Sequence, residues 1–384
     1  LGEGTDKNLE AISAFSASNI GNYYISNKFA KSKEPEIHKA WAWGNYKYQS
    51  KSKKNLLYVK EQKELEFLTF YSDCINFSRD LINSPANKLN PSTYYSKIKN
   101  NNLFKSFNFI DYTEKEINSN FPLTCAVGKS SSSKPKVIEI TNRKLSKKDK
   151  PLVIIGKGVT FDTGGVNIKP GTSMRNMKKD MGGSAIAISL FLLANYFLKK
   201  TKIVLIAPIA ENAISSKSMR PGDVYSSVSG KSVEIAHTDA EGRLLLADAI
   251  EKASSYNPCM IIDFATLTGA ARVALGEDLP AYFCNNETFA KKIENLNKEK
   301  LRCWRLPLYS PYLSKIKSQV ADLSNASLDG MAGSITAALF LQEFLKSPNI
   351  PWFHFDTFAW SQDSKGAALQ GLDIMSDFLR KNFN

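Results

Sequence analysis

The chain has 384 residues, of which 43% are hydrophobic and 11% aromatic, so it is long enough for a large domain with a smaller companion and too apolar for a disordered protein. Its formal net charge is +14, and most of the basic excess is lysine in the first 150 residues. Nucleic-acid grooves usually concentrate arginine and interleave aromatic side chains. We therefore favour a solvated basic surface, and a nucleic-acid partner is the less favoured alternative.

Neither the cysteines nor the apolar runs indicate an extracellular or membrane protein. The five cysteines are widely spaced and include no Cys-x-x-Cys pair, which disfavours a disulfide framework and a thiolate zinc site. The most apolar run, residues 185–198, is shorter than the roughly 20 residues that cross a bilayer and predicts a buried helix. No signal-peptide pattern occurs in the first thirty residues, although a sequence that begins at Leu1 leaves targeting open. We expect a cytoplasmic protein with no membrane partner.

The first part of the chain divides at a lysine-rich stretch. Residues 1–58 are polar and rich in Lys, Asn, Ser and Tyr, and we interpret them as a small or incomplete N-terminal domain, with the main domain at 59–384. Apolar residues recur at helical spacing over 61–82 and predict a long helix that ends just before Pro85. Within 129–150, a β-like VIEIT segment lies between Ser- and Lys-rich turns.

Beyond residue 150, strand and helix patterns alternate. We predict strands at 152–158, 202–210 and 260–267, and helices at 183–199 and 244–256. This alternation predicts an α/β fold with a mostly parallel central sheet flanked by helices, to which a small α/β N-terminal domain is added. Ligands of such sheets bind beyond the carboxyl ends of the strands, so the residues that follow each strand are the candidate site.

A Gly-rich segment, GKGVTFDTGG at 156–165, follows the first of these strands and begins a charged cluster. The cluster contains two lysines, Lys157 and Lys169, and two acids, Asp162 and Asp180. The glycines match neither the P-loop pattern nor G-x-G-x-x-G, so a nucleotide site is only a weak alternative.

A second charged cluster precedes the helix predicted at 244–256. Its members, Asp239, Glu241 and Arg243, are spaced two residues apart. Side chains at this spacing share a face only in extended backbone, so we expect an extended segment that points two carboxylates and a guanidinium into one space. Taken alone, the pattern is more often a ladder of surface ion pairs. Beside the first cluster, it favours a functional site.

Four carboxylates at neighbouring strand ends would repel one another unless cations lie among them, and two divalent metal ions would meet that need. The chain has three histidines, none in His-Glu-x-x-His spacing. A metal site here must therefore use oxygen ligands, with a lysine as a further candidate.

These clusters resemble the motifs of the leucine aminopeptidases, a family of di-zinc metallopeptidases. The family signature Asn-Thr-Asp-Ala-Glu-Gly-Arg-Leu corresponds to HTDAEGRL at 237–244, where His237 replaces the usual Asn. That change keeps the ligands and alters their surroundings. The resemblance covers about residues 80 to 360, and its other blocks are NSPAN at 83–87, GKGVTFDTGG at 156–165, MRPGDV at 219–224 and ATLTGA at 265–270. The N-terminal domain is shorter than the family pattern.

The resemblance implies a set of metal ligands. One metal ion, Zn or Mn, would be held by Lys157, Asp162, Asp180 and Glu241, and the other by Asp162, Asp239 and Glu241. A lysine binds metal only when neutral, and we expect burial and the adjacent dication to lower the pKa of Lys157.

The resemblance also implies the activity, which is hydrolysis of the N-terminal residue from peptides by a hydroxide that bridges the two metals. Lys169 would polarise the scissile carbonyl, and a bicarbonate ion bound by Arg243 would shuttle the proton. The pocket for the first side chain would be apolar and suit Leu or Met, with Met177, Thr266, Leu267 and Gly269 around it. Because relatives assemble as homohexamers, we expect the same assembly here.

Two other hypotheses are weighed against the aminopeptidase. One is a DNA-binding regulator built on the same scaffold, which the net charge of +14 keeps open. The other is an inactive paralogue that retains only the fold. The second is disfavoured because every ligand and catalytic position carries the side chain that the chemistry needs.

Overall fold

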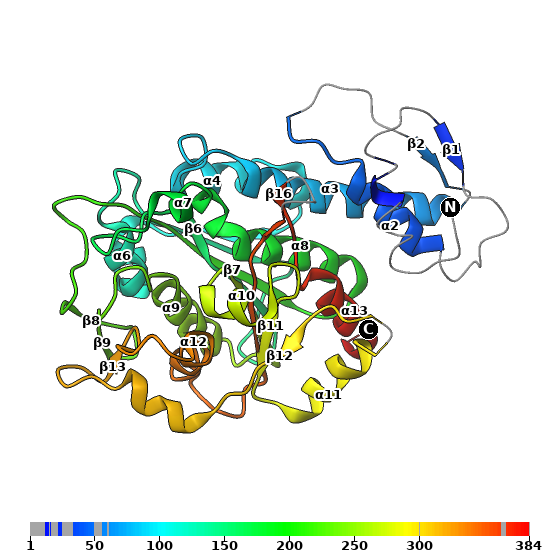
Figure 1. The fold of residues 1–384 in the computed structure, drawn as a ribbon. Helices are drawn as coiled ribbons and strands as arrows, with labels where there is room; N and C mark the ends of the chain where they lie inside the picture. The colour runs from blue at the N-terminus through cyan, green and yellow to red at the C-terminus, as the bar shows by residue number, and fades with distance from the viewer. Residues whose placement is uncertain are drawn as a thin grey trace.

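The structure is a computed structural model that describes residues 12–14, 16, 22–24, 34–49, 56–59, 61–298, 300–361 and 366–383. Within these residues a nine-stranded sheet runs through the molecule, with helices on both of its faces (Figure 1). The predicted α/β class is therefore confirmed.

The large sheet has the strand order β12-β11-β14-β10-β5-β7-β4-β3, and β6 pairs with the far end of β7. Its strands are β3 Asn108–Ile110, β4 Lys136–Thr141, β5 Leu152–Gly156, β6 Gly158–Asp162, β7 Ile203–Asn212, β10 Met260–Ala265, β11 Ala281–Cys284, β12 Trp304–Arg305 and β14 Trp352–Asp356. The remaining strands form small sheets and are β1 Asn22–Tyr24, β2 Leu56–Tyr58, β8 Val224–Ser226, β9 Ser232–Glu234, β13 Leu323–Ser324, β15 Trp360–Ser361 and β16 Gly366–Ala367.

The middle of the sheet is parallel and its flanks are mixed. β14, β10, β5 and β7 run parallel, whereas β4 is antiparallel to β7 and β11 is antiparallel to β14. Nearly every residue of β5, β7 and β10 is buried, which is why their sequences are continuous apolar runs without alternation. The three strands predicted after residue 150 are confirmed, and VIEIT lies within β4.

Helices cover both faces of the sheet. On one face, α8 contacts β5, β7 and β10 and is itself covered by α3 and α13, while on the other α9 contacts the same strands beside α6 and α12. The α-helices are α2 Glu34–Gly44, α3 Gln62–Asn83, α4 Pro91–Lys99, α5 Glu114–Asn120, α6 Pro122–Gly128, α7 Gly171–Met174, α8 Gly182–Phe197, α9 Gly242–Ser255, α10 Gly269–Leu275, α11 Glu287–Leu296, α12 Gly333–Gln342 and α13 Leu372–Phe383. The 3-10 helices are η2 Asn102–Phe104, η3 Met177–Met181 and η4 Ser310–Ile316.

Helix α8 is the central helix of the core. It is apolar on all sides because the sheet lies against one side and α3 and α13 against the other. Together with η3 it makes a stretch, Met177–Phe197, that is long and apolar enough to cross a membrane by length and composition only, but 83% of its most apolar 18-residue window is buried within the protein. The predicted buried helix is therefore confirmed.

The long helix predicted at 61–82 is also confirmed, as α3, and it ends at Asn83 two residues before Pro85. Much of the predicted N-terminal domain, 1–58, lies outside the described residues. The described parts include α2, which contacts α3, and the parallel pair of β1 and β2, which lies at one end of the molecule (Figure 1). The domain boundary between residues 58 and 59 stays a prediction.

The start of α8 requires a residue without a side chain at Gly183. A Cβ atom there would lie 2.2 Å from the backbone oxygen of Phe264 in β10, which cannot move without distorting the sheet. We expect Gly183→Ala to lower the free energy of unfolding by about 1–3 kcal/mol, as overpacking of a core does. Gly171→Ala is the matched control, because nothing lies within 4 Å of the added atom. Urea unfolding of both variants measures the difference, and equal stabilities would contradict this account.

Candidate functional site

A cavity of about 720 Å³ lies where the sequence analysis expects it, beyond the carboxyl ends of β5, β6 and β10. Its volume is in the range of ligand sites. Every site residue predicted from the sequence lines it, namely Lys157, Asp162, Lys169, Met177, Asp180, Asp239, Glu241, Arg243, Thr266, Leu267 and Gly269. The fold thus gathers the whole predicted set in one place, while the role of each residue stays a prediction.

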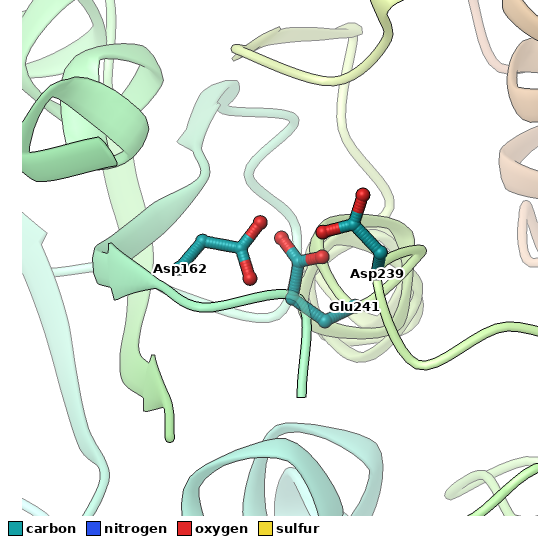
Figure 2. Close-up of side chains that lie close together, drawn as sticks. All are labelled: Asp162, Asp239 and Glu241. Carbon is teal, nitrogen blue, oxygen red and sulfur yellow. The ribbon is translucent and has the colours of Figure 1, made fainter. Parts of the chain in front are cut away.

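Three carboxylates form the centre of this cavity. Asp162 ends β6, Asp239 lies in a turn and Glu241 immediately precedes α9, and one oxygen of each lies within 4.8 Å of the others. Figure 2 shows the three carboxylate groups facing one another across a small gap. Like charges this close and this buried favour a cation between them, so the cluster can hold a divalent metal through oxygen ligands.

The expectation of an extended backbone from Asp239 to Arg243 is wrong. Asp239 lies in a turn, Glu241 is the N-cap of α9 with helical angles of φ −75° and ψ −35°, and Arg243 is already in the first turn of that helix. The two carboxylates meet because the turn leads directly into the helix, which alternation along the sequence does not reveal. Arg243 still lines the same cavity.

Lys157 joins the fourth carboxylate to the cluster. Its Nζ lies 2.9 Å from Oδ2 of Asp180 and 3.0 Å from Oε1 of Glu241, and it donates a hydrogen bond to the backbone oxygen of Thr266 at 2.8 Å. Burial disfavours the ammonium as expected, but the carboxylates of Asp180, Glu241 and Asp162 outweigh burial and raise the pKa of Lys157. A pKa of Lys157 below its ordinary value would therefore require the repelling positive charge of a metal ion.

Lys169 has different partners. Its Nζ lies 2.9 Å from Oδ2 of Asp162 and also pairs with Oδ1 of Asp239. Its side chain is 15% exposed, whereas that of Lys157 is 3% exposed. Burial opposes its charge, yet Asp162, Glu241 and Asp239 raise the pKa of Lys169. The two lysines thus occupy opposite halves of the acidic cluster, one more accessible than the other.

The second oxygen of Asp162 is held by neutral donors. The backbone N–H of Gly164 and Nδ2 of Asn212 each donate to Oδ1 at 2.8 Å. Gly164 has a φ of +87°, which glycine adopts without strain, and this turn brings its N–H back to the carboxylate. Asn212 ends β7, so attention to the residues at strand ends could have found it, but the sequence analysis missed it.

Arg243 lies buried in the cavity wall with unused donors. Its Nε and Nη1 have no hydrogen-bond partner among the described residues, and its guanidinium lies 6.0 Å from the centre of the Phe340 ring. Burial lowers the pKa of Arg243 to about 10, which still leaves it charged at neutral pH. A planar anion such as bicarbonate fits a buried guanidinium with free N–H groups.

Asp356 was missed as a support of the cavity wall. Its Oδ1 accepts hydrogen bonds from the backbone N–H groups of Leu267 and Thr268, at 3.1 and 3.0 Å, and its Oδ2 accepts from the hydroxyl groups of Thr268 and Ser334. This carboxylate ends β14 and fixes the loop that follows β10. Attention to the residues at strand ends could have identified Asp356 from the sequence.

The apolar pocket for a first side chain stays a prediction, and Lys179 lines the same cavity as the residues predicted for it. Only 5% of this lysine is exposed, and its Nζ lies 4.4 Å from the centre of the Phe358 ring. Burial lowers the pKa of Lys179 to about 8. The guanidinium of Arg272 lies 4.6 Å from the same ring. Met177 and Leu267 thus share the cavity with Lys179 and Arg272, in addition to the basic residues described above.

With this geometry described, comparison with known proteins gives the family. Residues 76–375 match the model of the cytosol aminopeptidase family, catalytic domain. This chain belongs to the cytosol aminopeptidase family, as the sequence motifs predicted.

Relatives and solved structures agree with that assignment. The chain is 37% identical to a probable cytosol aminopeptidase of Syntrophotalea carbinolica over 77% of its length and 59% of the relative's, and 41% identical to a cytosol aminopeptidase of Encephalitozoon cuniculi over 73% and 58%. It therefore spans under two thirds of the length of these curated relatives.

Among solved structures, a cytosol aminopeptidase from Coxiella burnetii superposes with a TM-score of 0.88 at 36% identity, over 97% of this chain and 84% of that one. The bottromycin maturation enzyme BotP in complex with Mn superposes with the same TM-score of 0.88 at 27% identity, over 100% of this chain and 89% of that one.

Metal affinity should rise with pH, because burial and the charge of Asp162 raise the pKa values of Glu241 and Asp239. Below these raised values a metal ion must displace the protons of the two carboxyl groups, and above them these two protons are already gone, so its affinity increases as the pH rises. A metal ion held by Lys157 displaces the proton of that ammonium as well. We expect roughly tenfold tighter binding per pH unit for each displaced proton between about pH 6 and 8. Calorimetric titration of metal-depleted protein with Mn²⁺ measures the slope. The slope should be shallower in Asp239→Asn, and a pH-independent affinity in the unchanged chain would contradict this account.

Proposed function

We propose that this chain is a metal-dependent aminopeptidase that removes single residues from the N-termini of peptides. The observation that carries the proposal is the cluster of Asp162, Asp239 and Glu241 within 4.8 Å, with a lysine paired to each half, in a chain of the cytosol aminopeptidase family. We assign the activity to a catalytic domain at 59–384, which contains the whole family match. The names of the relatives support a cytoplasmic location.

We propose two metal ions, Zn or Mn, as the resident cofactors. One would be held by Lys157, Asp162, Asp180 and Glu241, and the other by Asp162, Asp239 and Glu241. Charge balance supports this set, since the two ammonium groups that contact the four carboxylates cannot neutralise them. When bound, the ions supply a water molecule that is nucleophilic near neutral pH.

The chain's own side chains have complementary roles in this proposal. Lys157 would be neutral in the metal-bound enzyme and act as a ligand. Lys169 would stay protonated and donate a hydrogen bond to the carbonyl oxygen of the scissile bond, where negative charge develops. The greater exposure of the Lys169 side chain supports this division.

Arg243 is proposed to bind bicarbonate, which would accept and return the proton of the reaction. Its buried, unpartnered Nε and Nη1 support this role, because a buried guanidinium without an acceptor is destabilising. Glu241 raises the pKa of Arg243 against the effect of burial, which keeps the guanidinium charged for an anion.

The proposed substrates are peptides with a free N-terminal amine. Met177 and Leu267 supply apolar surface for a first side chain such as Leu or Met, with Thr266 and Gly269 beside them. A homohexamer is the proposed assembly. Large apolar side chains that are highly exposed in the single chain support self-association, among them Val273 at 88% and Leu328 at 91%.

The net charge of +14 keeps open a second candidate, a DNA-binding regulator on the same scaffold. The geometry of the acidic cavity gives that role no support. Binding to duplex DNA that weakens steeply with salt would favour it.

The first test of the aminopeptidase is removal of the metals. We expect chelation to abolish hydrolysis of aminoacyl anilides, and Mn, Zn or Co to restore it, because the nucleophile depends on bound metal. Asp239→Ala and Glu241→Ala should lower metal content together with rate, since each removes a carboxylate from the cluster. Elemental analysis of the purified variants measures the content. Activity that survives complete metal depletion, or full metal content in both variants, would refute the assignment.

The second test separates the two lysines. We expect Lys169→Ala to keep both metals and to lose turnover by roughly 100-fold or more, as loss of an oxyanion donor does. Lys157→Ala should instead weaken the binding of one metal, because its Nζ lies between Asp180 and Glu241. Metal stoichiometry and kcat, measured on both variants, decide the matter. The opposite pattern would mean that Lys157 donates to the carbonyl oxygen and Lys169 binds a metal.

A further inference from the structure

Lys179 is a buried lysine in the cavity whose charge the proposed mechanism does not use. Lys157 and Lys169 each pair with two carboxylates, whereas Lys179 makes no ion pair with any residue that the structure describes. Its recorded contact is with the ring of Phe358, 4.4 Å from Nζ to the ring centre. A cation–π contact offsets only part of the cost of burying an ammonium group.

Two carboxylates are close to Lys179 in the sequence or near its aromatic partner: Asp180 is its neighbour in the chain, and Glu277 lines a small pocket together with Phe358 and Arg272. The nearest carboxylate in the sequence, Asp180, is already engaged by Nζ of Lys157 and by the hydroxyl of Thr266. A second basic group lies at the Phe358 ring, the guanidinium of Arg272, which is exposed and 4.6 Å from the ring centre. Two cationic side chains therefore contact this ring, in contrast to the acidic cluster in the same cavity.

The position of Lys179 relates it to the first side chain of a substrate. The 3-10 helix η3 brings Met177, Lys179 and Asp180 to the same cavity. In the proposed function, the substrate's amine binds at the metal cluster that includes Asp180, and its first side chain lies against Met177. Lys179 lies between these two residues in the same turn and lines the same cavity, so its side chain borders the space that a bound substrate would occupy.

We propose that this pocket accepts acidic N-terminal residues, Glu and Asp, through an ion pair between the substrate's side-chain carboxylate and Lys179. The inference rests on the proposed aminopeptidase function and extends its substrate range. Leu and Met remain substrates, because Met177 and Leu267 still provide apolar surface. The carboxylate supplies the acceptor that the buried ammonium lacks, and Arg272 adds favourable charge at the rim.

The experiment compares substrates that differ in one charge. Fluorogenic amides of Glu, Gln and Leu are assayed with the metal-loaded full chain, since Gln has the shape of Glu without its charge. We expect kcat/KM for Glu to equal or exceed that for Gln. In Lys179→Met, the Glu/Gln ratio should fall by roughly tenfold or more, which is the effect of losing a hydrogen bond to a charged group. Turnover of Leu should persist.

Lys178→Met is the matched control. It removes the same charge one residue away, but the Nζ of Lys178 donates to the backbone oxygen of Asn83 and lies over the ring of Trp360, and Lys178 does not line the cavity. The Glu/Gln ratio of this variant should stay that of the unchanged chain. Equal changes in both variants would show a general charge effect and overturn the proposal.

Two further outcomes are distinguished. Cleavage of Leu and Gln amides with Glu slower by roughly tenfold or more would overturn the inference and leave the aminopeptidase intact. Absence of cleavage of every substrate would refute the aminopeptidase instead. In that case, thermal-shift titration of the metal-loaded chain with free L-Glu and L-Gln tests the pocket directly. Preference for L-Glu that Lys179→Met removes supports the pocket, and equal binding refutes it.

Discussion

Four carboxylates crowd around two lysines at the carboxyl end of the sheet, and the surrounding backbone holds them there. Lys157 contacts Asp180 and Glu241 through its ammonium, and its backbone is held on both sides, by the oxygen of Phe264 in β10 and by the N–H of Ser184 in α8. The sheet and its central helix therefore hold the backbone of Lys157, and with it one charge of the cluster, in a fixed position. Such rigidity is needed where like charges must stay close together.

Close packing follows from this arrangement. A Cβ atom at Gly242 would lie 2.6 Å from Nζ of Lys157, so a larger residue at the start of α9 would displace this ammonium. Gly242 thus lets the backbone of the helix come close to a charged side chain. Electrostatic strain of this kind is typical of functional sites, where stability is exchanged for reactivity.

The cavity combines two opposite electrostatic environments within a few residues. Asp180 belongs to the acidic cluster, whereas Lys179, the preceding residue, lies against the ring of Phe358, which Arg272 also contacts. A 3-10 turn makes this possible because its successive side chains point in different directions. A single residue on that turn can therefore change which first side chain is favoured while the metal-binding residues stay in place.

The sequence by itself determined the α/β class, the helices α3 and α8, the strands β5, β7 and β10, and the set of residues around the cavity. Those features depend on local periodicity, on chain order and on a contiguous signature, all of which are visible without coordinates. Only the tertiary structure showed that Glu241 starts a helix, and that Asn212 and Asp356 hold the acidic cluster and the cavity wall. Their contacts join residues 50 to 89 positions apart, so they are set by which strands are neighbours in the sheet and by their register. Local sequence patterns do not show which strands pair or in which register.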